Sequence, residues 1–130
     1  MRIALDTNAL VRLLVVDDSK QSAAVQKLCE SHQVLLLRTV LLESEWLLRG
    51  RFEISRTTIQ AFFNGLADTE NFELEDEVQT REALDAYSTG MDFADAIHMA
   101  SAGSTPLHTF DAKFVKRAAK HGQPVKQIRT

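Results

Sequence analysis

The sequence has little of several features that would define a class of protein at once. Cys29 is the only cysteine among 130 residues, so an internal disulfide is excluded. The beginning of the chain lacks the basic-then-apolar pattern of a signal peptide. No apolar run reaches the roughly 18 to 20 residues that cross a bilayer. We therefore expect a soluble protein of a reducing cytoplasm, with no membrane partner.

An excess of positive charge is also missing. The formal net charge is -3, whereas a domain built to bind nucleic acid is usually basic. Any polyanion must therefore be bound locally or with the help of cations. Charge is nevertheless uneven, because residues 68–85 are strongly acidic while the C-terminal end carries Lys113, Lys116, Arg117, Lys120, Lys126 and Arg129. Solvated helix faces account for most such runs, and the alternative is an RNA-contacting rim near Asp111.

No repeat, linker or low-complexity tract divides the chain. A chain of this length can bury roughly two-thirds of its extended-chain surface without disulfides or a structural metal. We therefore expect a single domain spanning residues 1–130.

Short apolar runs alternate with helical patterns along the whole sequence. Strands are predicted at 2–5, 34–37, 106–110 and 125–128, with a weaker edge strand at 72–74. Helices are predicted at 20–31, 40–49, 75–88, 92–102 and 112–121, with a further one capped by Ser55 or Thr57. A short helical pattern also follows Asn8, where Leu10, Val11, Leu13 and Leu14 recur at helical spacing. Thr39 is a plausible cap and Gly50 a stop signal for the helix at 40–49. This order predicts an α/β fold of three layers, α/β/α, around a central parallel sheet of four or five strands.

Four aspartates stand where a strand gives way to a helix or where a helix begins. Asp6 follows the first strand, Asp92 and Asp95 open a helix, and Asp111 separates a strand from the last helix. All four would lie at the carboxyl edge of a parallel sheet, where ligands and chemistry collect. The structural alternative is that they are N-caps or first-turn acids. Four acids at one edge would, however, repel one another, which raises pKa values or requires a cation.

A glutamate of the helix at 40–49 can reach the same edge. Glu43 and Glu45 are about 200° apart around a helix, so only one of them faces the site and the other faces solvent. Glu43 sits in an otherwise apolar stretch, and an acid in such a setting needs a partner. We therefore predict that Glu43 is the one that faces the site.

The donor types suggest which metal such an edge would bind. His32, His98, His108 and His121 are scattered without metal-ligand spacing, so zinc and copper are disfavoured. An all-carboxylate set suits Mg²⁺ or Mn²⁺. Such ions support hydrolysis of phosphodiesters, with one or two ions. The composition of the edge does not identify the substrate.

Taken together, these residues resemble a known family. Leu5-Asp6-Thr7-Asn8, Leu42-Glu43 before Trp46, Asp92-Phe93-Ala94-Asp95-Ala96 and Thr109-Phe110-Asp111 are similar to the acidic blocks of PIN-domain ribonucleases, in particular the VapC toxins of toxin–antitoxin modules. The resemblance implies that Asp6, Glu43, Asp92 and either Asp95 or Asp111 hold the metal. Thr7 and Asn8 match the segment that braces the first acid, and Thr109 matches a common Ser or Thr near the site.

The same resemblance implies an activity and partners. It implies an endoribonuclease that uses Mg²⁺ or Mn²⁺ and halts translation by cutting transfer or ribosomal RNA. It also implies a VapB-like antitoxin and a homodimer. The alternatives are a PIN protein of RNA processing, or one that binds RNA or protein without cutting. A signalling receiver domain fits poorly, because Asp6 is followed by Thr7-Asn8 rather than by a second acid.

Overall fold

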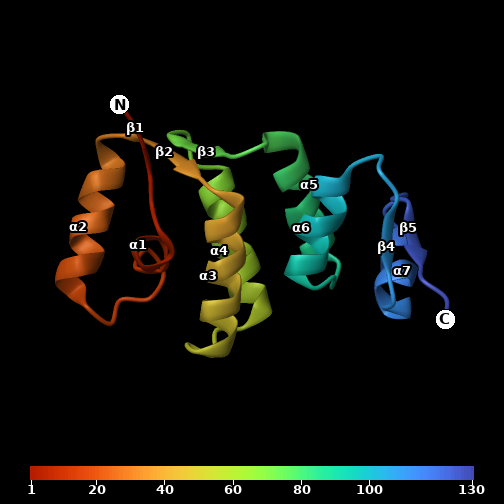
Figure 1. Cartoon of the computed structure of the whole chain (residues 1–130). Helices are drawn as coiled ribbons and strands as arrows, with labels where there is room; N and C mark the ends of the chain where they lie inside the picture. Colours follow the sequence, from red (N-terminus) through yellow and green to blue (C-terminus); the bar gives the residue numbers. More distant parts are fainter. The chain divides into compact units, whose positions relative to one another are not determined.

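The computed structural model describes all of residues 1–130 as two compact units, Met1–Glu77 and Val78–Thr130. Figure 1 follows the chain through seven helices and five strands. None of the helices is long and apolar enough to span a bilayer. All five strands pair in parallel, which confirms the predicted α/β class and is consistent with a three-layer α/β/α fold.

The first unit is built on a ladder of three strands in the order β1-β2-β3. They are β1 (Arg2–Ala4), β2 (Gln33–Leu36) and β3 (Phe72–Leu74). Val34 and Leu36 of the middle strand are buried, as expected for an apolar run covered by helices. The weak edge strand predicted at 72–74 is therefore present. The middle position of this ladder belongs to β2, and the strand that precedes Asp6 lies at its edge.

Four helices accompany this ladder. They are α1 (Thr7–Val11), α2 (Ser19–Glu30), α3 (Arg38–Gly50) and α4 (Arg56–Ala67). The short α1 packs against α2 and α3, and α4 contacts α3 and β3. Asp18 caps α2 through bonds of 3.1 Å from the amides of Lys20 and Gln21. Ser55, one of the two predicted caps, caps α4 through the amide of Thr58 at 3.2 Å.

The predicted ends of α3 are wrong at both sides. Thr39 is not a cap, because the helix begins at Arg38 and its N-cap position, Leu37, makes no side-chain bond. Glu75 supplies the missing acceptor, since its Oε1 accepts from the Arg38 amide at 2.8 Å. Gly50 does not stop the helix either, because it is still helical and the left-handed turn comes at Glu53, with φ 53°.

The second unit carries α5 (Glu77–Ser88), α6 (Phe93–Ala102) and α7 (Ala112–Ala119), with β4 (Leu107–Thr109) paired to β5 (Val125–Gln127). Tyr87 and Phe93 pack edge to face in its core, with ring centroids 4.9 Å apart. Ala83, Leu84 and Tyr87 of α5 are buried, whereas Val78 at the start of this helix is 71% exposed. Gly103 ends α6 with φ 58°.

Candidate active site

A pocket of about 320 Å³ in the first unit lies where α1 meets α3. It is lined by Asp6, Thr7, Asn8, Val40, Glu43, Trp46 and Leu47. Asp6 is separated from the end of β1 only by Leu5, and its Oδ1 caps α1 by accepting from the Ala9 amide at 2.9 Å. The structure therefore brings two of the predicted acids, Asp6 and Glu43, to one pocket.

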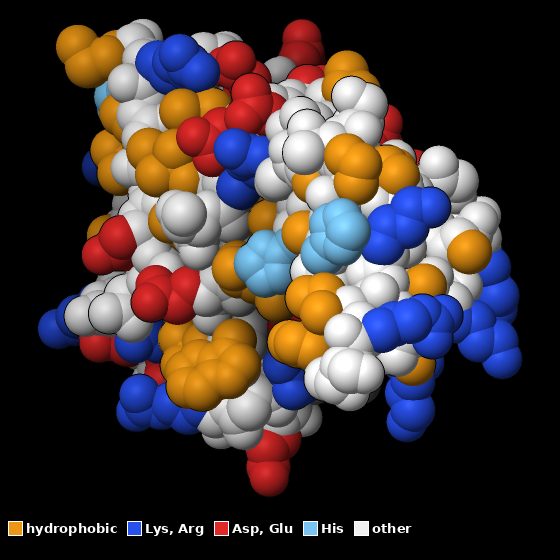
Figure 2. All heavy atoms as spheres, turned by 45° about the vertical axis from the view of Figure 1, so that its right-hand side comes forward, with side chains coloured by type: hydrophobic (Ala, Val, Ile, Leu, Met, Phe, Trp, Pro, Cys, Tyr) orange, Lys and Arg blue, Asp and Glu red, His pale blue; other side chains and the backbone are white.

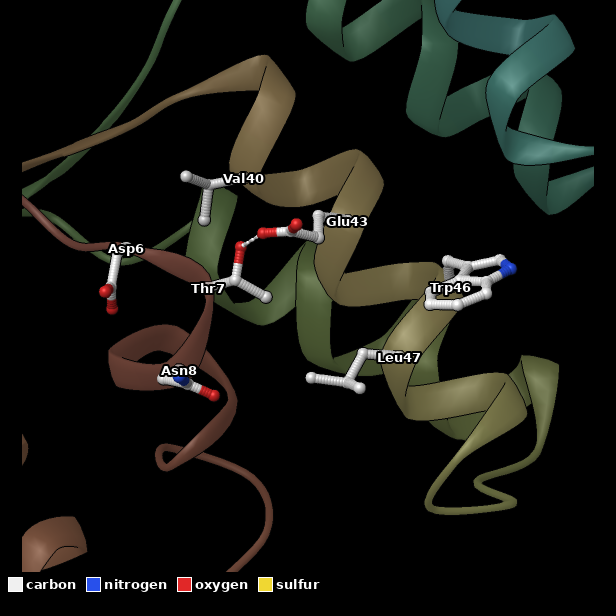
Figure 3. A pocket seen from close by; sticks show the side chains of 7 residues that line it. All are labelled: Asp6, Thr7, Asn8, Val40, Glu43, Trp46 and Leu47. Atoms are coloured by element: carbon white, nitrogen blue, oxygen red, sulfur yellow. Dashed lines mark hydrogen bonds between the residues drawn. The ribbon is translucent and has the colours of Figure 1, made fainter.

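Thr7 ties the two sides of this pocket together. Its hydroxyl donates a hydrogen bond to the Oε1 of Glu43, as Figure 3 shows. Thr7 itself is only 8% exposed, so its side chain is fixed by the surrounding core. Thr7 was expected to support the first acid, Asp6, but its hydroxyl bonds to Glu43 instead. The Asp6 carboxylate is held by the hydrogen bond from the Ala9 amide.

Glu43 and Glu45 separate as the helical angle requires, but one part of the prediction is wrong. Glu43 lies at the pocket, whereas Glu45, which was expected to face solvent, is only 3% exposed. Arg49, one turn further along α3, donates to Glu45 Oε2 from Nε at 2.9 Å. A buried carboxylate with a guanidinium partner is a structural ion pair, which explains why this acid tolerates burial.

Trp46 is a lining residue that the sequence reasoning did not select. It lies one turn after Glu43 on α3, as Figure 3 shows, and is 66% exposed. The signal was present in the sequence, because a residue three positions after Glu43 shares its helix face. An exposed indole beside acidic groups offers a flat surface for stacking.

Three predicted acids come together in the second unit. Asp92, Asp95 and Asp111 line one pocket of about 170 Å³, together with Met91, Lys113, Phe114 and Arg117. Asp92 caps α6 by accepting from the Asp95 amide at 3.2 Å. Asp111 caps α7 through the amides of Lys113 at 2.9 Å and Phe114 at 3.2 Å. Both aspartates are therefore N-caps, as the structural alternative proposed, and both still face the pocket.

Thr109 fixes the approach to Asp111. Its Oγ1 accepts from the Asp111 amide at 3.0 Å. This bond closes a tight turn between β4 and α7 and sets the direction in which the carboxylate leaves the backbone. Thr109 thus has a positioning role next to the acid that the sequence singled out.

The carboxylates of this pocket interact electrostatically. The pKa of Asp95 is raised above its ordinary value, first because burial disfavours its charged form and then because of the charges of Asp92 and Asp111. His98 acts in the opposite direction. Repulsion of this kind is what a bound cation would relieve.

The side chains fit a hard divalent cation by the chemistry of their donors. Asp6, Asp92 and Asp111 each use one carboxylate oxygen as a cap, and the second oxygen has no hydrogen-bond partner. Asp95 uses neither of its oxygens. Within neither unit do three or more His, Cys, Asp or Glu side chains converge as a ready-made metal-binding group. Carboxylates completed by water are nevertheless the usual surroundings of Mg²⁺.

Comparison with known families identifies the class of protein. The sequence model of the PIN domain matches residues 3–120, so the chain belongs to the PIN-domain family. PIN domains have a nuclease-type fold, act on nucleic acids and generally depend on divalent metals such as Mg²⁺. This match confirms the PIN-domain family that the sequence motifs predicted. No match was found among curated proteins.

Proposed function

We propose that the chain is a metal-dependent endoribonuclease that hydrolyses RNA phosphodiester bonds. The observation that carries the proposal is the pocket shared by Asp92, Asp95 and Asp111, in which burial, and after it the charges of the other two aspartates, raise the pKa of Asp95. An arrangement that is unfavourable for the empty protein becomes favourable when a cation is present. Membership of the PIN family supports the same activity.

In this proposal Asp6, Glu43, Asp92, Asp95 and Asp111 are the metal-site acids. When bound, Mg²⁺ or Mn²⁺ supplies Lewis-acid chemistry that activates water and neutralises charge on the phosphodiester. Thr7 holds Glu43, Thr109 positions Asp111, and Asn8 lines the pocket beside Asp6. Trp46 provides the stacking surface for a base of the RNA.

The biological role we propose is that of a VapC-type toxin. The order of the four acidic blocks along the chain, ending in Thr109-Phe110-Asp111, supports this assignment. The toxin would inhibit translation by cutting transfer or ribosomal RNA. Its partners would be the RNA substrate, a VapB-like antitoxin and a second copy of the chain.

The decisive experiment is cleavage of total cellular RNA by the purified chain in Mg²⁺, Mn²⁺ or EDTA, with the new ends mapped. Discrete cuts in either metal that disappear in EDTA and in the Asp92→Asn variant are expected. Asp85→Asn is the matched control, because Asp85 is an exposed aspartate of α5 outside both pockets. Absence of cutting by metal-loaded protein on every RNA would contradict the nuclease assignment and favour a binding role.

A second experiment addresses the toxin role. Induced expression of the wild-type chain should arrest growth and protein synthesis, while Asp92→Asn should not. Co-expression of the small protein encoded next to the gene should restore growth if that protein is the antitoxin. Growth unaffected by an active nuclease would instead place the chain in RNA processing.

A further inference from the structure

The last helix carries a row of cations. Lys113, Lys116, Arg117 and Lys120 follow the spacing i, i+3, i+4, i+7, which places them on one face of α7 and its C-cap. We call these four residues the α7 basic face. The row is about 10 Å long at the helical rise of 1.5 Å per residue. On the opposite side Phe114 and Ala118 are buried in the second unit.

No acid of the chain forms an ion pair with the α7 basic face. None of the four cations forms an ion pair, although both Arg12 and Arg38 do so elsewhere. The Arg117 guanidinium donates instead to the carbonyl of Gly90, which fixes its position without removing its charge. Four cations without an ion-pair partner, in a chain of net charge -3, mark a local binding surface for an anion.

Helix stability alone does not explain the row. Lys116, Arg117 and Lys120 lie near the C-terminal end, where the helix dipole favours cations. Lys113, however, is the second residue of α7, where the dipole disfavours a positive charge. Lys113 shares a pocket with Asp92, Asp95 and Asp111, whose negative charges offset this cost, but it forms no ion pair with them and so stays available to a ligand.

One pocket joins the α7 basic face to the acids, and a second pocket continues along the cations. Lys113 and Arg117 line the pocket of Asp92, Asp95 and Asp111. Arg117 and Lys120 line a second pocket of about 420 Å³ with Thr89, Gly90 and His121. Arg117 therefore belongs to both pockets, and the row of cations leads away from the carboxylates. In Figure 2 several Lys and Arg side chains lie near one another at the right of the face that it draws, and others are scattered over its left and centre.

An exposed aromatic ring lies at the start of the row. Phe110 is 66% exposed and directly precedes Asp111. Cations that follow a backbone, combined with an aromatic surface, are the features by which proteins bind single-stranded nucleic acid. A duplex would leave its bases stacked on one another, so the exposed ring favours a single strand.

We propose that the α7 basic face binds the sugar–phosphate backbone of single-stranded RNA next to the bond that is cut, with one base stacked on Phe110. This inference rests on the proposed nuclease function and names the substrate class and the residues that hold it. Lys113 and Arg117 contact the phosphate nearest the acids, and Lys120 contacts a phosphate further along the strand.

The test of this proposal is an RNA-binding assay. Binding of a labelled single-stranded RNA of about 12 nucleotides is measured by fluorescence anisotropy, in EDTA and over a range of salt concentrations. The Lys113→Ala/Lys120→Ala double variant should lower the slope of log K against log salt by about 1.4, at about 0.7 per lost phosphate contact. The matched control is Lys20→Ala/Lys27→Ala, which removes two exposed lysines of α2. Equal slopes in the two double variants would overturn the proposal.

Two further variants keep the test independent of folding. Arg117→Gln should lower the slope by about 0.7, with thermal melting used to compare its stability with that of the wild type. Phe110→Ala should weaken binding about tenfold without changing the slope, because stacking releases no counterions. A change of slope in Phe110→Ala, or no loss of affinity, would contradict the stacking role.

The outcomes separate this inference from the proposed function. RNA binding that depends on α7, in a chain that never cuts RNA, would leave the inference standing and remove the nuclease. Metal-dependent cutting by the wild-type chain, with an unchanged salt slope in Lys113→Ala/Lys120→Ala, would support the nuclease and overturn the inference about α7. Displacement of the RNA by a polyglutamate peptide of equal charge and concentration would assign the α7 basic face to an acidic protein partner and overturn the inference.

Discussion

Three aspartates of this chain accept hydrogen bonds from the first turn of the helix that follows them. Asp6, Asp92 and Asp111 each leave one carboxylate oxygen without a partner. Capping and chemistry are therefore not competing explanations for these residues. The cap fixes the side chain at the end of a helix, and the remaining oxygen is directed by that same bond. In the proposed metal site, a carboxylate held in this way would be oriented before a cation binds.

Substitution at Asp92 can separate the two roles. Asn caps helices as well as Asp does, whereas Ala does not. Asp92→Asn should therefore abolish RNA cutting with a melting temperature at or above that of the wild type. Asp92→Ala should abolish cutting and also lose about 1 kcal/mol of stability, or about 4 °C. Thermal melts combined with the cleavage assay measure both effects, and a large loss of stability in Asp92→Asn would favour a purely structural aspartate.

Asp95 gives a prediction about pH. Its pKa is raised in the folded chain, by burial first and by Asp92 and Asp111 second, so the folded state binds this proton more tightly than the unfolded state. Ionised Asp95 therefore destabilises the fold at pH 7, and this effect disappears as the pH falls below the ordinary value of 3.8. In metal-free buffer Asp95→Asn should melt at a higher temperature than the wild type at pH 7.

The difference between Asp95→Asn and the wild type should shrink as the pH is lowered toward 4. Asp85→Asn, an exposed position of α5, controls for the general effect of removing one negative charge. A gain in Asp95→Asn that matched the control at every pH would show that repulsion in the pocket is absent.

The direction of a side chain could be predicted from sequence, because it follows from helix geometry. Its burial and its partners could not, because they depend on residues that are distant in sequence. The angle between Glu43 and Glu45 correctly predicted that they point in different directions. It could not reveal that the side away from the pocket is buried and that Arg49 pairs with Glu45 there. Trp46 was overlooked because the exposure of an aromatic side chain depends on what packs around it.

At the scale of elements, short apolar runs and helical periodicity predicted every strand and helix core, because both patterns follow from local geometry. Helix ends were harder, because they depend on distant partners. The start of α3 rests on Glu75, which is 37 positions away from Arg38 in sequence. A search for a local cap therefore selected Thr39 wrongly.

Glycines at the C-terminal ends of helices α3 and α6 give opposite predictions for stability. Gly50 is helical and an added Cβ would meet nothing within 4 Å, so Gly50→Ala should stabilise the chain by about 0.5 kcal/mol. Gly103 also has open space, but its φ of 58° and ψ of −122° are nearly restricted to glycine. Gly103→Ala should therefore cost about 1 to 3 kcal/mol. Urea titrations of both variants measure the difference, and equal effects would contradict these helix ends.

At the scale of the whole molecule, the division into Met1–Glu77 and Val78–Thr130 was not predicted. The sequence shows no linker near residue 77, and the match to the PIN domain runs from residue 3 to residue 120 across that boundary. Predicted acids are found in both units, since Asp6 and Glu43 belong to the first and Asp92, Asp95 and Asp111 to the second. A catalytic role for all five acids requires that both units fold as one PIN domain.

Cooperative unfolding tests that requirement. Trp46 is the only tryptophan and belongs to the first unit, so its fluorescence reports on that unit alone. Gly103→Ala acts in the second unit. If residues 1–130 form one domain, Gly103→Ala should lower the urea midpoint of the Trp46 signal and of the circular dichroism signal by the same amount. Loss of helical signal at a lower urea concentration than the Trp46 transition would show that the units unfold separately. The two groups of acids would then belong to separate domains.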